Sequence, residues 1–289
     1  AIVAQRDLEK MIHDTDYKVG AARNVVMIQC VGSRNFERPY CSRYCCSEAI
    51  KNALKLKELD PEKDVTILYR DIRTYGLKED FYKKARELNV KFVRFDEERK
   101  PEVKVDGGKV TVSVFDPVMN EPVDLRADIL ALSVGTVPNP DNAATGMMLK
   151  VPTNQDGFFL EAHVKLRPVD FATDGVFMCG MSHAPKMSEE TIAQANAAVS
   201  RACTILTKDF IESEGKTAYV NKERCMACGL CEANCPYGAV AVDLAEGAAV
   251  VNTVLCKGCG VCTASCRMNA IDLNGFNNEE VLAQISSAI

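Results

Sequence analysis

Cysteines are the residues in this sequence whose number and spacing are best suited to chemistry. The 289-residue chain contains fourteen of them, and eight lie in two runs with the same spacing, C-x2-C-x2-C-x3-C. The first run is Cys225, Cys228, Cys231 and Cys235, and the second is Cys256, Cys259, Cys262 and Cys266. Because nothing in the sequence points to secretion, clustered thiols of this kind are better explained as metal ligands than as disulfide partners.

The repeated spacing predicts two [4Fe–4S] clusters in the arrangement of bacterial ferredoxins, where the fourth cysteine of each run ligates the other cluster. One cluster is expected to bind Cys225, Cys228, Cys231 and Cys266, and the other Cys256, Cys259, Cys262 and Cys235. The alternatives are zinc sites or free core thiols, but a zinc site usually pairs one C-x2-C with a distant second pair. Arg267 stands where the first run has Pro236, a change that removes no ligand.

Four further cysteines gather where the first predicted strand leads to the helix that follows it: Cys30 ends the strand, Cys41 lies between the two elements, and Cys45 and Cys46 open the helix. In a dinucleotide-binding fold this turn carries G-x-G-x-x-G, with the pyrophosphate at the helix N-terminus. Here the motif is absent, and the helix dipole would favour thiolates at this position. We therefore expect a third [4Fe–4S] cluster in place of a nicotinamide nucleotide. The alternatives are a redox-active cysteine pair or packed structural thiols.

The elements expected to position these cysteines alternate between strand and helix. Short apolar runs bounded by turn residues predict buried strands, and apolar residues at helical spacing predict helices. The expected order is a strand at 23–32, a helix at 47–59, a strand at 64–69, a helix at 78–88 and a strand at 90–95. This order is typical of a parallel, doubly wound sheet in an α/β fold.

Further elements are expected along the rest of the chain. They are a hairpin at 102–115 turning at Gly107-Gly108, strands at 128–134 and 175–179, a helix at 188–206 with Ser188 as N-cap, and a short C-terminal helix. Two cysteines are left without a predicted ligand role, Cys179 and Cys203. Since Cys203 lies in the apolar part of the predicted helix, we expect it to be buried.

Composition and charge narrow the class of protein. The hydrophobic fraction of 47% and the charged fraction of 26% are ordinary for a globular chain. The net charge is −5 and no Lys/Arg-rich block is present, which argues against a nucleic-acid partner. No apolar run approaches the roughly 18–20 residues of a membrane span, and the N-terminus lacks the pattern of a signal peptide. These features predict a cytoplasmic protein without a membrane span.

The segment from Asp170 to Ala202 resembles the second FAD-binding motif of thioredoxin-reductase-like flavoproteins, a T-x-G-[VI]-[FY]-x-x-G-D strand followed by a helix. Thr173, Gly175, Val176, Phe177 and Gly180 match, and Met181 replaces the usual Asp. The resemblance implies FAD contacts at Gly175, Val176, Gly180, Met181, Ser182, Lys186, Thr191 and Gln194. It also implies a partial FAD/NAD(P)-binding domain followed by an α+β two-[4Fe–4S] ferredoxin domain.

Nearly the whole chain resembles the C-terminal portion of the A subunit of heterodisulfide reductase. The matching stretches include QCVGSR, YCSRYCC, ILYRDIRTYG, LSVGTVPN, DGFFLEAHVKLRPVD and GMSHAPK. The resemblance implies an oxidoreductase subunit that carries FAD and [4Fe–4S] clusters in a flavin-based electron-bifurcating or confurcating complex of the kind used in methanogenesis. Expected partners are the other heterodisulfide reductase subunits and a hydrogenase- or formate dehydrogenase-type electron donor.

The resemblance also suggests roles for single residues outside the cysteine groups. Lys186 is expected near the flavin, where a cation would favour the anionic reduced ring, although a solvated surface lysine is an equal alternative. His183 is either part of the same pocket or structural. Arg70 and Arg73 follow the second strand, where either a nucleotide-binding role or a surface ion-pair network would fit.

The Gly-rich FAD motif of the family is absent from this chain. We therefore expect a partner chain that carries it, with FAD shared between the two, and no activity of this chain alone. Ala1 would suit a start processed by Met removal, which favours a naturally split subunit over a fragment. The alternatives for the whole are a related bacterial complex with another acceptor (an aromatic acyl-CoA or a quinone), a subunit that only relays electrons, and an NAD(P)H-dependent disulfide reductase.

These observations divide the sequence into six expected segments. They are an N-terminal lead-in at 1–18, a nucleotide-binding-like α/β domain with a cysteine cluster site at 19–135, an FAD-contacting segment at 136–208, a linker at 209–216, a two-[4Fe–4S] ferredoxin domain at 217–275 and a C-terminal helix at 276–289.

Overall fold

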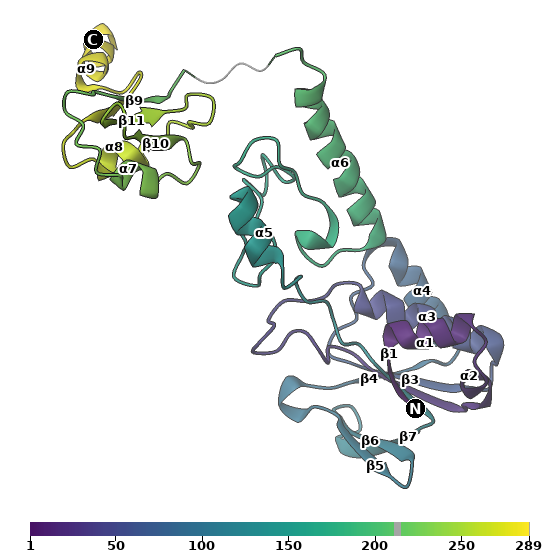
Figure 1. Ribbon diagram of the computed structural model, residues 1–289. Helices are drawn as coiled ribbons and strands as arrows, with labels where there is room; N and C mark the ends of the chain where they lie inside the picture. Colours follow the sequence, from purple (N-terminus) through teal and green to yellow (C-terminus); the bar gives the residue numbers. More distant parts are fainter. Residues whose placement is uncertain (211–214, 289) are drawn as a thin grey trace. The chain divides into compact units, whose positions relative to one another are not determined.

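The computed structural model describes residues 1–210 and 215–288 (Figure 1). It divides into two units. The first contains Ala1–Asn142, Thr153–Phe159 and Met178–Asn196, and the second contains Ala143–Pro152, Leu160–Phe177 and the residues from Ala197 onward. No helix within the described ranges is long and apolar enough to cross a membrane. The linker expected at 209–216 and the helix expected at 276–289 lie partly outside the described residues, at 211–214 and at 289.

The first unit is built around a parallel sheet of five strands in the order β1-β8-β2-β3-β4. The strands are β1 (Ile2–Ala4), β2 (Asn24–Ile28), β3 (Asp64–Tyr69), β4 (Lys91–Arg94) and β8 (Ile129–Leu132). Met27 in the central strand β2 lies beside Ile67 of β3 and Ala131 of β8. The strands expected at 23–32, 64–69, 90–95 and 128–134 are confirmed. Strand β1 lies in the expected lead-in and is too short to show a sequence pattern.

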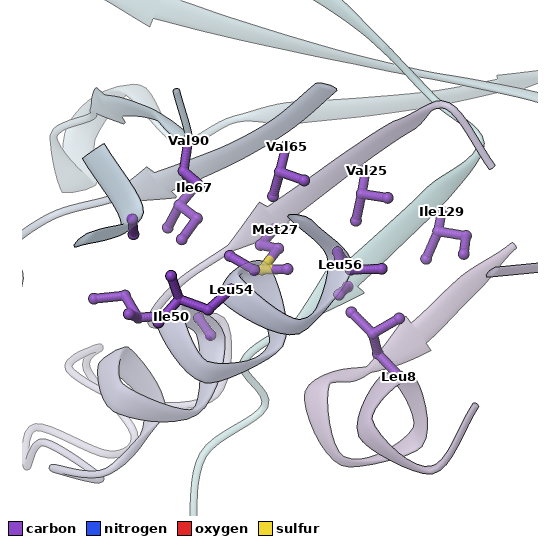
Figure 2. Packing of buried hydrophobic residues seen from close by; sticks show 14 of the residues in the cluster. Leu8, Val25, Met27, Ile50, Leu54, Leu56, Val65, Ile67, Val90 and Ile129 are labelled. Carbon is purple, nitrogen blue, oxygen red and sulfur yellow. The ribbon is translucent and has the colours of Figure 1, made fainter. Parts of the chain in front are cut away.

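One face of this sheet is covered by helices (Figure 1). They are α1 (Gln5–His13), α2 (Tyr17–Ala21), α3 (Cys45–Leu59) and α4 (Glu79–Glu87), with 3-10 turns η1 (Gly76–Lys78) and η2 (Glu97–Arg99) elsewhere in the unit. Figure 2 shows Ile50 and Leu56 of α3 packed against the sheet near Met27. Both side chains are almost fully buried, which contributes about 1.5–3 kcal/mol each. This packing fixes α3, and with it the cysteines at its start.

The opposite face carries a second, antiparallel sheet. Its strands are β5 (Glu102–Asp106), β6 (Lys109–Asp116) and β7 (Glu121–Ala127), in the order β5-β6-β7. Val112 and Val114 of β6 pack on Val26 and Leu130 of the central sheet. The α/β class and the hairpin at 102–115 are confirmed, and this meander takes the place of the helices that a doubly wound fold would have on its second face.

Three helical elements follow the sheets along the chain. They are α5 (Asn142–Leu149), the 3-10 turn η3 (Gly180–Ser182) and α6 (Ser188–Leu206). The helix expected at 188–206 is confirmed. Ser188 is the first residue of the helix and not the N-cap that precedes it. Glu190 Oε2 accepts the N–H of Met187 at 2.9 Å. The strand expected at 175–179 is wrong. Gly175 adopts a left-handed φ of 78° in a turn, and Phe177 makes only an isolated bridge with Asp170.

The C-terminal part of the second unit contains two small antiparallel sheets and three helices. The elements are β9 (Ala218–Val220), α7 (Leu230–Ala233), β10 (Val240–Asp243), β11 (Ala248–Val251), α8 (Val261–Ser265), β12 (Ile271–Leu273) and α9 (Asn278–Ala288). Strand β9 pairs with β12, and β10 pairs with β11. Each half of the repeat therefore supplies one short helix and two strands, as in the expected α+β ferredoxin domain.

Candidate metal centres

The eight cysteines of the repeat line two separate pockets in the second unit. Cys225, Cys228, Cys231 and Cys266 line one pocket, and Cys235, Cys256, Cys259 and Cys262 line the other. In each pocket the fourth cysteine comes from the other half of the repeat. The structure thus brings together the two groups of four that the spacing predicts.

Left-handed backbone positions recur at corresponding places in the two halves. Gly229 (φ 76°) precedes α7 and Gly260 (φ 78°) precedes α8, so each helix begins between the second and third cysteines of its run. Ala227 and Gly258 are a second left-handed pair. At Gly258 a Cβ atom would lie 2.1 Å from the carbonyl oxygen of Lys216, so only glycine fits there.

Backbone N–H groups donate to the sulfur atoms with the same symmetry. Ala249 donates to Cys225 Sγ at 3.4 Å and Ala218 to Cys256 Sγ at 3.3 Å. The fourth cysteines are bonded likewise, Cys235 by Ala239 at 3.2 Å and Cys266 by Ala270 at 3.3 Å. Each pocket therefore receives two N–H···S bonds, which stabilise thiolates and tune the reduction potential of a bound cluster.

The donor set in both pockets is chemically suited to an iron–sulfur cluster. Among the described residues, four cysteines and no His, Asp or Glu line each pocket, and soft thiolate ligands favour iron–sulfur clusters or zinc. Burial raises the pKa of Cys231 and of Cys262, so these thiols must lose protons when a metal centre binds. In the described ranges no three His, Cys, Asp or Glu side chains are arranged around a single ion. In a cubane the four thiolates are distributed around a cluster of iron atoms.

The second group of cysteines lies at the carboxyl end of the central strand β2. Strands β2, β3 and β8 are parallel, so residues 29–44, 70–75 and 133–137 follow the same edge of the sheet. The chain runs from β2 to β3 on one side and later returns to β8 on the other side of β2. This reversal of direction is the position where ligands bind in open α/β sheets. Cys30 lies directly at it.

Two glycines allow residues 29–44, here called the cysteine loop, and the segment that follows strand β8 to approach each other closely. A Cβ atom on Gly32 would lie 1.6 Å from the carbonyl oxygen of Val134. Gly135 has a left-handed φ of 81°, and a Cβ atom there would lie 2.8 Å from Ser42 Oγ. The N–H of Thr136 donates to this buried Ser42 Oγ at 2.9 Å. The loop is thereby fixed to the segment after β8 at two points, next to Cys30 and next to Cys41.

Cys30, Cys41, Cys45 and Cys46 lie close enough to influence one another electrostatically. Burial, together with the neighbouring thiols, raises the pKa of Cys45 to about 12 and that of Cys46 to about 11. The pKa of Cys30 is raised mainly by burial, against the effect of Arg34. The helix dipole was expected to favour thiolates here, but in the metal-free chain desolvation has the larger effect and favours the protonated thiols. Metal binding would have to displace these protons.

Arginines surround this second group of cysteines. Arg34 Nη1 lies 4.0 Å from Cys30 Sγ, and its guanidinium pairs with Asp71 at 2.7 Å. Arg70 pairs with Glu97 at 2.7 Å, and Arg73 lies 3.9 Å from Asp71. Of the two roles considered for Arg70 and Arg73, the structure shows the ion-pair network. These cations compensate part of the negative charge that four thiolates would bring together.

A pocket of about 820 Å³ in the first unit lies between α3, the start of α4 and the start of α6. Its wall includes Met181 and Lys186, two of the expected flavin contacts, and the apolar side chains of Ile50 and Leu54. Ser47 and Thr74 also line it, and their buried hydroxyls have no hydrogen-bond partner among the described residues. Its volume falls within the range of small-molecule and cofactor sites.

The other expected flavin contacts are divided between the two units. Gly175 and Val176 lie in the second unit, and Gly180, Ser182, Thr191 and Gln194 lie in the first. Gln194 Oε1 accepts the N–H of Gly180 at 2.8 Å, and its Nε2 lies 3.0 Å from His183 Nδ1. Gln194 therefore holds the turn before α6.

The two remaining cysteines are both exposed to solvent. The expectation that Cys203 is buried is wrong, because α6 buries only Ala198 along its length. Cys179 lies just before η3.

Comparison with known proteins gives matches over the whole chain. Residues 218–241 match the family model for a 4Fe-4S binding domain. The chain is 38% identical to the A subunit of the H(2):CoB-CoM heterodisulfide,ferredoxin reductase of Methanothermobacter marburgensis, over all of this chain and 45% of that protein. It is 37% identical to the A subunit of the Ferredoxin:CoB-CoM heterodisulfide reductase of Methanosarcina acetivorans, over 92% of this chain and 33% of that protein.

The chain spans less than half the length of these curated relatives. Among solved structures, a thioredoxin reductase of T. acidophilum is similar with a TM-score of 0.41 and 20% identity, over 63% of this chain and 50% of that one.

Proposed function

Since the chain is homologous to the C-terminal part of the A subunit of heterodisulfide reductase, we propose that it is an iron–sulfur flavoprotein subunit of a heterodisulfide-reductase-type complex. In this role it carries single electrons between FAD and partner subunits through three [4Fe–4S] clusters. The complex bifurcates or confurcates electrons at the flavin, which supplies the conversion between two-electron and one-electron chemistry.

The observation that carries this proposal is the pair of pockets lined by four cysteines each. Their composition and their matched N–H···S bonds fit two cubanes in one small domain. Cys30, Cys41, Cys45 and Cys46 are the ligands for the third cluster. Their place at the carboxyl edge of the parallel sheet is the ligand position of this fold class.

The 820 Å³ pocket is the part of this chain that would receive the flavin ring. Its apolar wall suits a planar aromatic ring, and the hydroxyls of Ser47 and Thr74 can bond to polar ring atoms. Lys186 places a cation at the same wall, where it would favour the anionic reduced ring. Ser47 directly follows Cys46, so the first turn of α3 borders both the pocket and the third cysteine group.

The remaining contacts to FAD, those to its diphosphate, come from a partner chain with a Gly-rich strand–helix turn. Helix α6 presents a stripe of apolar residues at helical spacing to solvent, which consists of Ile192, Val199, Cys203 and Leu206. Ile192 and Val199 are each 62% exposed and Leu206 is 79% exposed. Such a stripe on a globular protein indicates a surface that is covered in its working state.

The names of the relatives support a proposal for the donor and the acceptor. We propose a hydrogenase- or formate dehydrogenase-type donor and the other heterodisulfide reductase subunits as partners. A complex with another acceptor, such as an aromatic acyl-CoA or a quinone, uses the same subunit chemistry. A subunit that only relays electrons is the second candidate, because this chain has no G-x-G-x-x-G motif to bind FAD alone.

Purification of the native complex under anaerobic conditions tests this proposal. Mass spectrometry of the co-purified subunits should identify a chain with a Gly-rich FAD motif, and the complex should contain flavin. Mixing with the reduced donor should then reduce both the flavin and the clusters. A complex that contains clusters without flavin would support the relay function instead.

A further inference from the structure

Arg43 lies in the middle of the cysteine loop, between Cys41 and Cys45. Its φ of 63° is left-handed, a conformation that residues with a side chain rarely adopt. Its backbone N–H donates to Cys41 Sγ at 3.2 Å. A backbone in this region persists only when the surrounding structure holds it, and such positions are concentrated at functional sites.

The side chain of Arg43 supplies that hold by connecting three segments of the first unit. Nη2 donates to Glu190 Oε1 at 2.5 Å and to Tyr75 Oη at 2.8 Å, and Nη1 donates to the carbonyl oxygen of Pro185 at 3.4 Å. Glu190 uses its second oxygen to accept the N–H of Met187. The planar guanidinium therefore fixes the segment Pro185–Glu190 to the cysteine loop.

We propose that Arg43 is a positioning residue that couples the third cluster site to the segment Pro185–Glu190, which carries Lys186. The inference rests on the proposed function for the identity of the two cofactors. Binding of a cluster would fix Cys41 and Cys45 on either side of Arg43. The hydrogen bonds of the Arg43 guanidinium to Pro185 and Glu190 would then restrict the motion of the segment that forms one wall of the 820 Å³ pocket. The cation also lies beside the cluster site, where it favours the more negative, reduced state of a cluster.

Hydrogen exchange of the full chain tests the coupling without any measurement of activity. The amides of Met187 and Thr191 report on the segment, because they donate to Glu190 Oε2 and to the carbonyl oxygen of Met187. Arg43→Gln should speed their exchange at least tenfold. Glu190→Gln should also speed their exchange, because it removes the ion pair with Arg43 and weakens the acceptor of the Met187 amide. Arg38→Gln is the matched control, because Arg38 lies in the same loop and its guanidinium pairs with the exposed Glu37 at 3.6 Å.

A redox titration of the reconstituted chain provides the second measurement. Arg43→Gln should shift the reduction potential of the third cluster to a more negative value. Arg43→Lys should keep the potential near that of the wild type, because it keeps the charge, while it still speeds the exchange. Unchanged exchange in Arg43→Gln would overturn the coupling, whatever the result for Glu190→Gln. An unchanged potential in Arg43→Gln would overturn the electrostatic role.

The two measurements separate this inference from the proposed function. If the wild-type chain binds no third cluster, the proposed cluster is wrong, and the exchange of the metal-free chain still decides whether Arg43 holds the segment. If the third cluster binds normally and Arg43→Gln changes neither exchange nor potential, the proposed function stands and the inference is wrong.

Discussion

The carbonyl oxygen of Val134 occupies the position where a side chain on Gly32 would begin, 1.6 Å from the Cβ atom that an alanine would carry. This contact joins the cysteine loop to the end of strand β8. Any residue with a side chain at position 32 would clash with this carbonyl group.

Gly32→Ala is therefore expected to destabilise the first unit by about 3 kcal/mol, near the upper end of the usual cost of overpacking. It should also impair assembly of a cluster at Cys30. Chemical denaturation measures the first effect. Gly20→Ala is the matched control, since a Cβ atom there meets nothing within 4 Å, and it should be neutral or stabilising by up to about 1 kcal/mol. Equal stability of the two variants would contradict the close approach.

Lys63 is almost completely buried and donates to the carbonyl oxygens of Val19 at 2.9 Å and Ala22 at 2.5 Å. Lys63→Met should destabilise the chain by about 2–4 kcal/mol, because it leaves buried carbonyl groups without a donor. In contrast, Lys91→Met removes an exposed ion pair with Asp64 and should cost at most about 1 kcal/mol. Thermal unfolding of the two variants measures the difference, and a similar loss in both would show that the buried ammonium is not important.

We expect no specific binding of NAD(H) or NADP(H). The turn after β2 has no G-x-G-x-x-G cradle for a pyrophosphate, and the cysteine loop occupies its place. Isothermal calorimetry with NADH and NADPH should show no saturable heat. Tight binding of either nucleotide would contradict this prediction and support an NAD(P)H-dependent disulfide reductase.

The isolated chain should not retain FAD. The proposed flavin pocket has an apolar wall, but these 289 residues contain no Gly-rich turn whose helix N-terminus would neutralise the diphosphate. Equilibrium dialysis should show weak or no binding to the chain alone, and stoichiometric binding once a partner with the Gly-rich motif is added. Stoichiometric FAD on the isolated 289-residue chain would exclude a shared site.

The sequence predicts the elements whose residues carry a strong local pattern. Strands β2 and β3 are buried on both faces, which produces continuous apolar runs. The spacing of the eight cysteines likewise predicts the two groups of four that line the pockets. Strand β7 has no continuous apolar run, because Asp124 and Arg126 are exposed, and Pro122 is a residue type that is rare in strands.

Features that depend on packing could not be predicted. The motif at 175–179 matches a strand by residue type, but Asp174 and Gly175 form a turn. The high pKa values of Cys45 and Cys46 arise mainly from burial in the folded chain, which no local rule anticipates. The link between Arg43 and Glu190 joins residues far apart in the sequence and has no signal in either segment.

The central claim is that the chain carries three [4Fe–4S] clusters, and iron analysis with EPR of the anaerobically reconstituted chain tests it most directly. Four thiolates per cubane predict about twelve irons per chain, and Cys45→Ser/Cys46→Ser should reduce this to about eight while leaving the two ferredoxin-type signals intact. Eight irons in the wild type, with Cys30, Cys41, Cys45 and Cys46 all open to alkylation, would contradict the claim.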